Sequence, residues 1–126
     1  MSCSKEEFEK MLKNEQLSSG ELESLLRARE KDEIDFVLID IREVYEFNEL
    51  SIKGTDLLIP TSIINREIGT FERLKDRFVI LYCRTASRTG QVMYALKRMG
   101  YENIAHLSSG IMGYKGETLQ NAPIPS

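Results

Sequence analysis

The stretch FVILYCRTASRTGQVMYAL, residues 78–96, joins a short apolar run to a helical pattern through a few mostly polar residues. The run FVILY is apolar or aromatic throughout, which is typical of a strand buried on both faces of a parallel sheet. After it, residues 89–99 predict a helix that ends near Gly100, a common helix-terminating residue. Its predicted apolar face consists of Val92, Ala95, Leu96 and Met99. A strand, a short loop and a helix in this order are the building unit of α/β domains.

Three other short apolar runs repeat the strand pattern: FVLID at 36–40, DLLIP at 56–60 and NIAHL at 103–107. Helices are predicted at residues 5–14 and from Ser18 or Ser19, either of which suits an N-cap. The predicted apolar faces are Phe8, Met11 and Leu12 in the first helix and Leu22, Leu25 and Leu26 in the second. We therefore predict a compact α/β domain with a mainly parallel central sheet of about five short strands flanked by helices.

Composition and charge narrow the class of protein. The 126 residues contain no linker-like segment, so we expect a single domain over residues 1–126. A net charge of -3 argues against a nucleic-acid-binding protein, which needs a clustered excess of Lys and Arg. No stretch has the roughly 20 apolar residues of a membrane span, and the charged start MSCSKEEFEKMLK does not resemble an export signal. We expect a cytoplasmic protein without a nucleic-acid or membrane partner, whose Cys3 and Cys83 are reduced.

Cys83 directly follows the apolar run at 78–82 and is therefore predicted at the carboxyl edge of the sheet, where ligands of α/β domains bind. A cysteine after an apolar strand is, taken alone, more often a small core residue than a nucleophile. Here, however, residues 84–88 lead into a helix N-terminus, and their backbone N–H groups could form a nest for an anion. Arg84, Arg88 and the helix N-terminus favour the thiolate form of the cysteine, which is the nucleophile of sulfur chemistry.

The loop CRTASRTGQ, residues 83–91, together with the strand before it resembles the active-site loop of the rhodanese family of sulfurtransferases. Three other segments resemble the family's remaining motifs in the family's order: LIDIREVYEF at 38–47, IKGTDLLIP at 52–60 and NIAHLSSGIMGY at 103–114. The resemblance covers about residues 17–116. It leaves out residues 1–16, which carry an extra N-terminal helix, and a tail at 117–126.

The resemblance implies that Cys83 takes a sulfane sulfur from a donor such as thiosulfate, becomes a persulfide, and passes the sulfur to cyanide or a thiol. It also implies a set of substrate-binding residues, whose backbone amides would hold the terminal sulfur: Arg84, Thr85, Ala86, Ser87 and Arg88. The side chains of Arg84 and Arg88 would attract the anionic donor. No metal or other cofactor is expected. The expected partners are a small anionic sulfur donor and a thiol or cyanide acceptor.

Two alternative functions stay open at this stage. A persulfide relay or a protein-binding module of the same family would keep Cys83 without efficient turnover, and a relay would require a protein partner. The related phosphatases and arsenate reductases have a loop one residue longer, which fits a tetrahedral oxyanion. Four residues separate Cys83 from Arg88, and this shorter loop favours a single sulfur atom.

A further group of residues is expected to support the loop: Asp40, Arg42, Glu46 and Thr89. An acid followed by an arginine is most simply a structural ion pair or a helix cap. The functional hypothesis is that one of the acids pairs with Arg88 and fixes the loop. Thr89 keeps a hydroxyl at the helix N-terminus. Ala86 stands where many relatives have glycine, so a positive φ at this position would strain the backbone.

Two more residues could carry chemistry. His106 is the only histidine, and on an apolar strand we expect a packed or surface side chain, because a thiolate that is already ionised needs no base. Cys3, near the N-terminus, could act as a resolving thiol, although a simple exposed position is the favoured interpretation.

Overall fold

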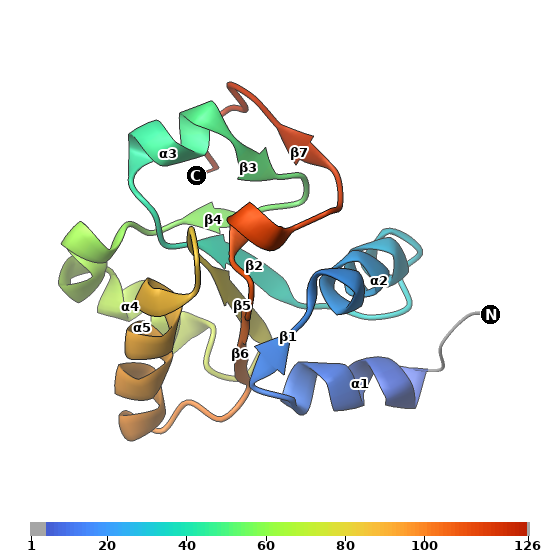
Figure 1. Ribbon diagram of the computed structural model, residues 1–126. Coiled ribbons are helices and arrows are strands. Elements are labelled where there is room, and N and C mark those ends of the chain that lie inside the picture. The colour runs from blue at the N-terminus through green and yellow to red at the C-terminus, as the bar shows by residue number, and fades with distance from the viewer. Residues whose placement is uncertain (1–4, 126) are drawn as a thin grey trace.

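The computed structural model describes residues 5–125 and has a five-stranded parallel sheet at its centre (Figure 1). The strand order is β1-β6-β5-β2-β4, and every pairing in this sheet is parallel. The strands are β1 Gln16–Leu17, β2 Val37–Asp40, β4 Leu57–Leu58, β5 Val79–Tyr82 and β6 Ile104–Leu107. The predicted α/β class and the mainly parallel sheet are therefore confirmed.

The three central strands match the apolar runs of the sequence. Every residue of β2, β5 and β6 is buried, as expected of strands covered on both faces. β4 differs from the expectation for DLLIP, because only Leu57 and Leu58 form the strand and both are partly exposed. The reason is its place in the sheet: β4 lies at the edge and has β2 as its single neighbour.

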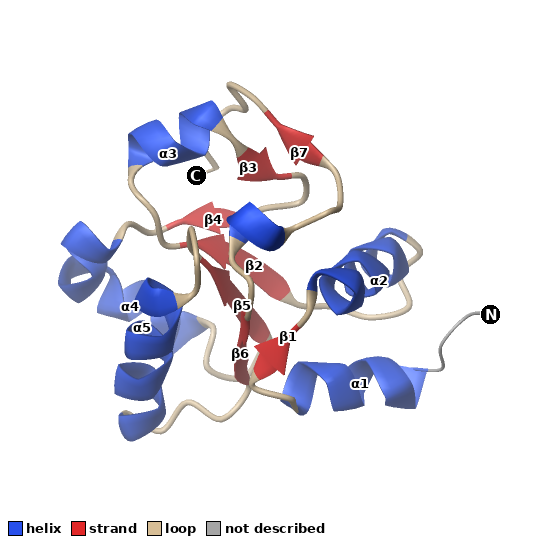
Figure 2. Cartoon of the chain, viewed as in Figure 1, coloured by secondary structure: helices blue, strands red, loops and turns tan. Residues whose placement is uncertain are grey.

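Helices cover both faces of the sheet (Figure 2). α1 Lys5–Lys13 and α2 Ser19–Glu30 lie on one face, and α4 Ile68–Arg73 and α5 Ser87–Arg98 on the other. Each face buries its own apolar cluster. Since neighbouring residues of a strand point to opposite faces, Ala105 and Leu107 of β6 join the α1–α2 cluster, while Ile104 joins the α4–α5 cluster.

The two N-terminal helices form as the sequence predicts. Ser18 is the N-cap of α2, and it forms a capping box in which its hydroxyl accepts the Glu21 N–H at 3.2 Å and its own N–H donates to Glu21 Oε1 at 3.0 Å. In α1, Phe8 and Leu12 are buried in the same cluster as Leu107. The helix that lies outside the family resemblance is therefore part of the core.

The helix after Cys83 corrects one prediction. α5 begins at Ser87, two residues before the predicted start at 89, and ends at Arg98. Its buried residues are Thr89, Met93 and Leu96, whereas the predicted core residues Ala95 and Met99 are exposed. The apolar pattern misplaced this face because it gave no weight to Thr89, a polar residue that is buried below the loop.

A smaller layer stands over the carboxyl ends of the central strands (Figure 1). It contains α3 Val44–Glu49 and a two-stranded antiparallel sheet of β3 Ser51–Ile52 and β7 Thr118–Leu119. Two 3-10 helices, η1 Thr61–Glu67 and η2 Ile111–Gly113, complete the chain's regular structure among residues 5–125. Within those residues, no helix combines the length and the apolar character that crossing a membrane requires.

Candidate active site

Cys83 directly follows β5 at the carboxyl edge of the sheet, as the sequence predicts. The residue is fully buried, at 0% exposure, and lies on the α4–α5 side of the sheet. Its Sγ accepts a hydrogen bond from the Ala86 N–H at 3.1 Å. The preceding residue, Tyr82, points to the opposite face, where its hydroxyl accepts the Ile52 N–H at 3.2 Å. The two side chains thus fix the end of β5 from both faces.

Residues 83–86 connect β5 to α5, and Ser87 and Arg88 begin the helix. Arg84, Thr85 and Ser87 are exposed, while Ala86 and Arg88 are partly buried. Ala86 is the N-cap residue of α5, and it has no side-chain oxygen or nitrogen that could cap the helix. The N–H groups of the first helical turn have no partner within their own helix, so they are suited to bind an anion beside the sulfur.

Ala86 has a positive φ of 87°, with ψ at -11°. This left-handed conformation costs an L-residue roughly 1–2 kcal/mol. The strain that we expected for a positive φ at Ala86 is therefore present. Three hydrogen bonds hold the residue in place. Its N–H donates to Cys83 Sγ, and its carbonyl oxygen accepts from Gly90 N and from Thr89 Oγ1, both at 3.0 Å.

A glycine turn holds the first half of the loop. Ile111 N donates to Cys83 O at 2.9 Å, and Met112 N donates to Arg84 O at 3.1 Å. Gly110, which precedes them, has a φ of 65°, and a Cβ at this position would lie 2.2 Å from Arg84 O. Only glycine allows the two backbones to approach this closely.

An ion pair holds the second half of the loop. Arg88 Nη1 and Nη2 donate to the two carboxylate oxygens of Glu46 at 2.9 and 3.0 Å. These hydrogen bonds lower the pKa of Glu46 to about 2. The functional hypothesis was that one of the acids pairs with Arg88. In the structure, that acid is Glu46. Within residues 5–125, the guanidinium of Arg84 has no ion-pair partner.

Asp40 and Arg42 form a separate, buried ion pair. Arg42 Nε and Nη2 donate to the Asp40 carboxylate at 2.8–3.1 Å, and Nη2 also donates to Leu50 O at 2.6 Å. Burial raises the pKa of Asp40, and the hydrogen bonds from Arg42 oppose that rise. Neither side chain has a hydrogen bond to residues 84–88. The pair instead connects Arg42, just before the N-cap of α3, to Leu50, its C-cap, and so holds the helix that carries Glu46.

Thr89 and His106 connect to the thiol from below the loop. Thr89 Oγ1 lies 3.7 Å from Cys83 Sγ and 2.7 Å from Nδ1 of His106. His106 is buried, at 6% exposure. Of the two positions expected for it, packed or on the surface, it takes the packed one. The sequence did not reveal its link to Cys83, because that link depends on how β6 and α5 pack. Cys3 lies outside the described residues.

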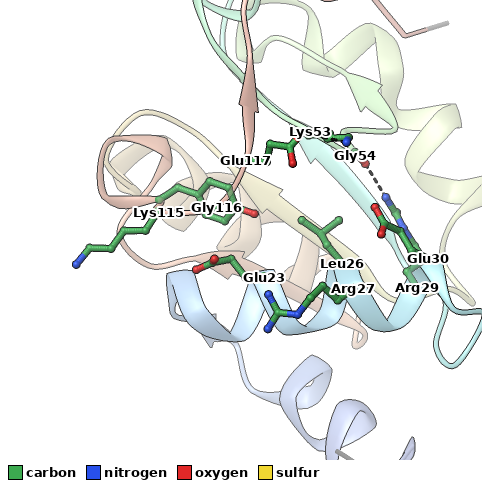
Figure 3. A pocket seen from close by; sticks show the side chains of 11 residues that line it. Glu23, Leu26, Arg27, Arg29, Glu30, Lys53, Gly54, Lys115, Gly116 and Glu117 are labelled. Atoms are coloured by element: carbon green, nitrogen blue, oxygen red, sulfur yellow. Dashed lines mark hydrogen bonds and ion pairs between the residues drawn. The ribbon is translucent and has the colours of Figure 1, made fainter. Parts of the chain in front are cut away.

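A separate hollow lies elsewhere on the protein (Figure 3). It is a cleft of about 500 Å³ between α2 and residues 53–54 and 114–117, and none of its lining residues belongs to the Cys83 loop. Two of its charged groups, Lys53 and Glu117, pair with each other at 2.9 Å, and Arg29 donates to Gly54 O at 2.7 Å. No cysteine, serine or threonine is among the described residues that line it. Among residues 5–125, no three His, Cys, Asp or Glu side chains are grouped to hold a metal ion.

Comparisons with known proteins identify a family to which the chain is similar. The sequence model of one family, described as the rhodanese-like domain, matches residues 21–117. A protein named "Sulfurtransferase" from Allochromatium vinosum is 34% identical over 89 residues, which cover 71% of this chain and 80% of that protein. The "Probable adenylyltransferase/sulfurtransferase MoeZ" of Mycobacterium tuberculosis is 36% identical over 77 residues, covering 61% of this chain. That match spans only 19% of MoeZ.

A solved structure shows the same fold. The thiosulfate sulfurtransferase of Pseudomonas aeruginosa superposes with a TM-score of 0.70 over 85% of this chain and 20% of that chain. At 21% sequence identity, this likeness concerns the fold alone.

Replacement of Gly110 tests the glycine turn. Gly110→Ala should lower the free energy of unfolding by about 2–4 kcal/mol, because the new methyl group collides with the backbone of Arg84 and requires a positive φ. Urea unfolding measures the change. Gly20→Ala is the control, since a Cβ there meets nothing within 4 Å and should leave stability unchanged or slightly raised. Equal stability of both variants would contradict the close approach at Gly110.

The strain at Ala86 has its own test. Ala86→Gly should leave stability unchanged or raise it by up to about 1 kcal/mol, because relief of the left-handed strain offsets the chain entropy that glycine adds. Ala95→Gly, at an exposed interior position of the same helix, should instead lose about 1 kcal/mol. Thermal or urea unfolding compares the two. An equal loss in both variants would show that Ala86 is not strained.

The Glu46–Arg88 pair predicts a pH dependence. The pKa of Glu46 is lowered, so the stability that this pair supplies is complete above about pH 4.5 and is lost as the pH falls toward 2. Glu46→Gln should cost about 1–2 kcal/mol at pH 7, since Arg88 is partly exposed, and clearly less near pH 2, where about half of Glu46 is protonated. Urea unfolding at several pH values measures this. Glu49→Gln, exposed on the same helix, should cost little at pH 7, and a similar loss there would refute the pairing.

Proposed function

Since the chain belongs to the rhodanese-like domain family, we propose that it is a sulfurtransferase that moves a sulfane sulfur from an anionic donor to a thiophilic acceptor through a persulfide on Cys83. The sulfurtransferase names of its relatives support the reaction class. Thiosulfate is the proposed donor, and cyanide or a thiol is the proposed acceptor.

One observation carries the proposal. The Cys83 sulfur lies beneath a loop of four residues that opens α5, and it already accepts one backbone N–H from that loop, Ala86 N at 3.1 Å. N–H groups of a helix N-terminus stabilise an anion, first the thiolate and then the terminal sulfur of a persulfide. The small size of the loop suits the binding of a single sulfur atom.

The proposed first half-reaction is a displacement at sulfur. The Cys83 thiolate attacks the outer sulfur of thiosulfate, a new sulfur–sulfur bond forms on Cys83, and sulfite leaves with the electron pair of the broken bond. In the second half-reaction, cyanide or a thiolate attacks the terminal sulfur and restores the Cys83 thiolate. The negative charge on the two sides of each step is equal, and no oxidant is consumed.

The two arginines of the loop have different proposed roles. Arg88 is engaged by both oxygens of Glu46, so its main contribution is to hold the loop. Arg84 is exposed and has no ion-pair partner among residues 5–125, so its charge can attract an anionic donor. Because Cys83 is fully buried, the donor reaches the sulfur only when the loop makes room, which favours a small donor.

A mass measurement tests the persulfide. Treatment with thiosulfate should add the mass of one sulfur atom to the intact protein, because the donor leaves one sulfur on Cys83. Cys83→Ser should abolish the addition. Cys3→Ser is the matched control and should keep it. If wild type gains no sulfur from thiosulfate or from a small persulfide donor, the proposal is wrong.

The loaded protein then separates the alternatives. Addition of cyanide should remove the extra sulfur and release thiocyanate. A protein that loads sulfur but releases none to cyanide or to a small thiol would instead be a relay that needs a protein acceptor. Hydrolysis of a phosphate ester by the same preparation, abolished by Cys83→Ser, would favour a phosphatase, which the four-residue loop disfavours.

A further inference from the structure

The buried position of Cys83 raises a question about its proton. At 0% exposure, the thiol has no direct contact with water to which the proton could pass. Within residues 5–125, Sγ has two hydrogen-bonding neighbours, Ala86 N and Thr89 Oγ1. The backbone N–H can only donate. The Thr89 hydroxyl is therefore the neighbour that can accept the thiol proton.

The Thr89 hydroxyl leads to one titratable group. Besides Sγ, its oxygen contacts Ala86 O at 3.0 Å and His106 Nδ1 at 2.7 Å. A backbone carbonyl does not take up a proton near neutral pH, whereas an imidazole does. A chain of hydrogen bonds thus runs from Cys83 Sγ through Thr89 Oγ1 to His106 Nδ1.

The packing around His106 buries its imidazole ring. His106 lies on β6 between Gln16 of β1 and Leu81 of β5, and β6 is covered by α5 on the side of Ile104. Two charged side chains lie on the segments that adjoin β6: Glu15, just before β1, and Lys97 of α5. They form an ion pair with each other. Burial lowers the pKa of His106, so the ring is neutral at pH 7 and one ring nitrogen can accept a hydrogen bond.

We propose that His106 receives the proton of Cys83 through the hydroxyl of Thr89, and so generates the reactive thiolate. The inference rests on the proposed role of Cys83 as nucleophile. The Thr89 hydroxyl proton turns from Ala86 O to His106 Nδ1 and moves onto that nitrogen as the thiol proton moves to Thr89 Oγ1. The products are a thiolate that accepts a hydrogen bond from Thr89 and an imidazolium that donates one to it; the sum is one proton transferred and no change in electrons. His106 acts through Thr89 and is a positioning residue for the proton.

The experiment measures the reactivity of Cys83 without any sulfur donor. In a Cys3→Ser background, the rate of alkylation of Cys83 by iodoacetamide is followed between pH 5 and 9 by intact mass. His106→Asn keeps a polar atom near the position of Nδ1 but takes up no proton, and Thr89→Val removes the hydroxyl at nearly constant shape. Each variant should lower the alkylation rate at pH 7 about tenfold and move the pH profile upward by about one pH unit.

Two controls address folding and coupling. Gln16→Asn changes the register neighbour of His106 on β1 and should leave the profile as it is in the background protein. The double variant of His106→Asn and Thr89→Val should be no slower than either single variant, because both interrupt the same chain. Thr89→Ser, which keeps the hydroxyl, should retain the profile of the background protein even if Thr89→Val folds poorly.

Three results would overturn the inference. They are an unchanged pH profile of alkylation in His106→Asn, a shifted pH profile in Thr89→Val but not in His106→Asn, or additive losses of alkylation rate in the double variant. The proposed function fails separately, through the absence of the persulfide in the mass measurement with thiosulfate. A protein whose alkylation depends on His106 but which loads no sulfur would support the proton transfer and contradict the proposed sulfurtransferase activity.

Discussion

The hydrogen bond from Ala86 N–H to Cys83 Sγ sets the shape of the site. For this N–H to point at a sulfur three residues back, the chain must turn sharply at the N-terminus of α5, and Ala86 takes a positive φ of 87° to do so. An alanine in that conformation is strained, and strain of this kind persists only where the surroundings over-determine it. The rest of the site can be understood as the set of contacts that hold the turn.

Those contacts come from segments that are far apart in the sequence. The turn at Gly110 binds the carbonyls of Cys83 and Arg84, while Glu46 of α3 binds Arg88 on the other side of the strained residue. α3 is in turn fixed by the buried pair of Asp40 and Arg42. The motifs around residues 40–46, 83–91 and 106–114 therefore meet at one point in space. Their spacing in the chain follows from the parallel sheet, which brings the carboxyl ends of β2, β5 and β6 together.

The sequence predicted what depends on uniform apolar runs and missed what depends on packing. Runs 36–40, 78–82 and 103–107 predicted the central strands because each is buried on both faces. The run 56–60 predicted the edge strand β4, which is shorter than expected, whereas the two-residue edge strand β1 was not predicted. The position of Cys83 follows from a strand, loop and helix in succession. By contrast, the choice of Glu46 over Asp40 as partner of Arg88 depends on where α3 sits. The contact of His106 with Thr89 depends on the rotation of α5, which the apolar pattern misplaced.

Burial and charge together argue for sulfur rather than for phosphate as the cargo. A phosphoryl group brings several charged oxygens that each require donors, and a four-residue loop with Arg88 already bound to Glu46 supplies few. A single sulfur atom carries one charge, is polarizable, and needs little more than the backbone N–H groups of a helix N-terminus. A fully buried thiol also limits the water that could reach a sulfur held there. Burial of Cys83 also removes direct contact between the thiol and water, so the proposed chemistry needs an internal proton acceptor, for which we propose Thr89 with His106.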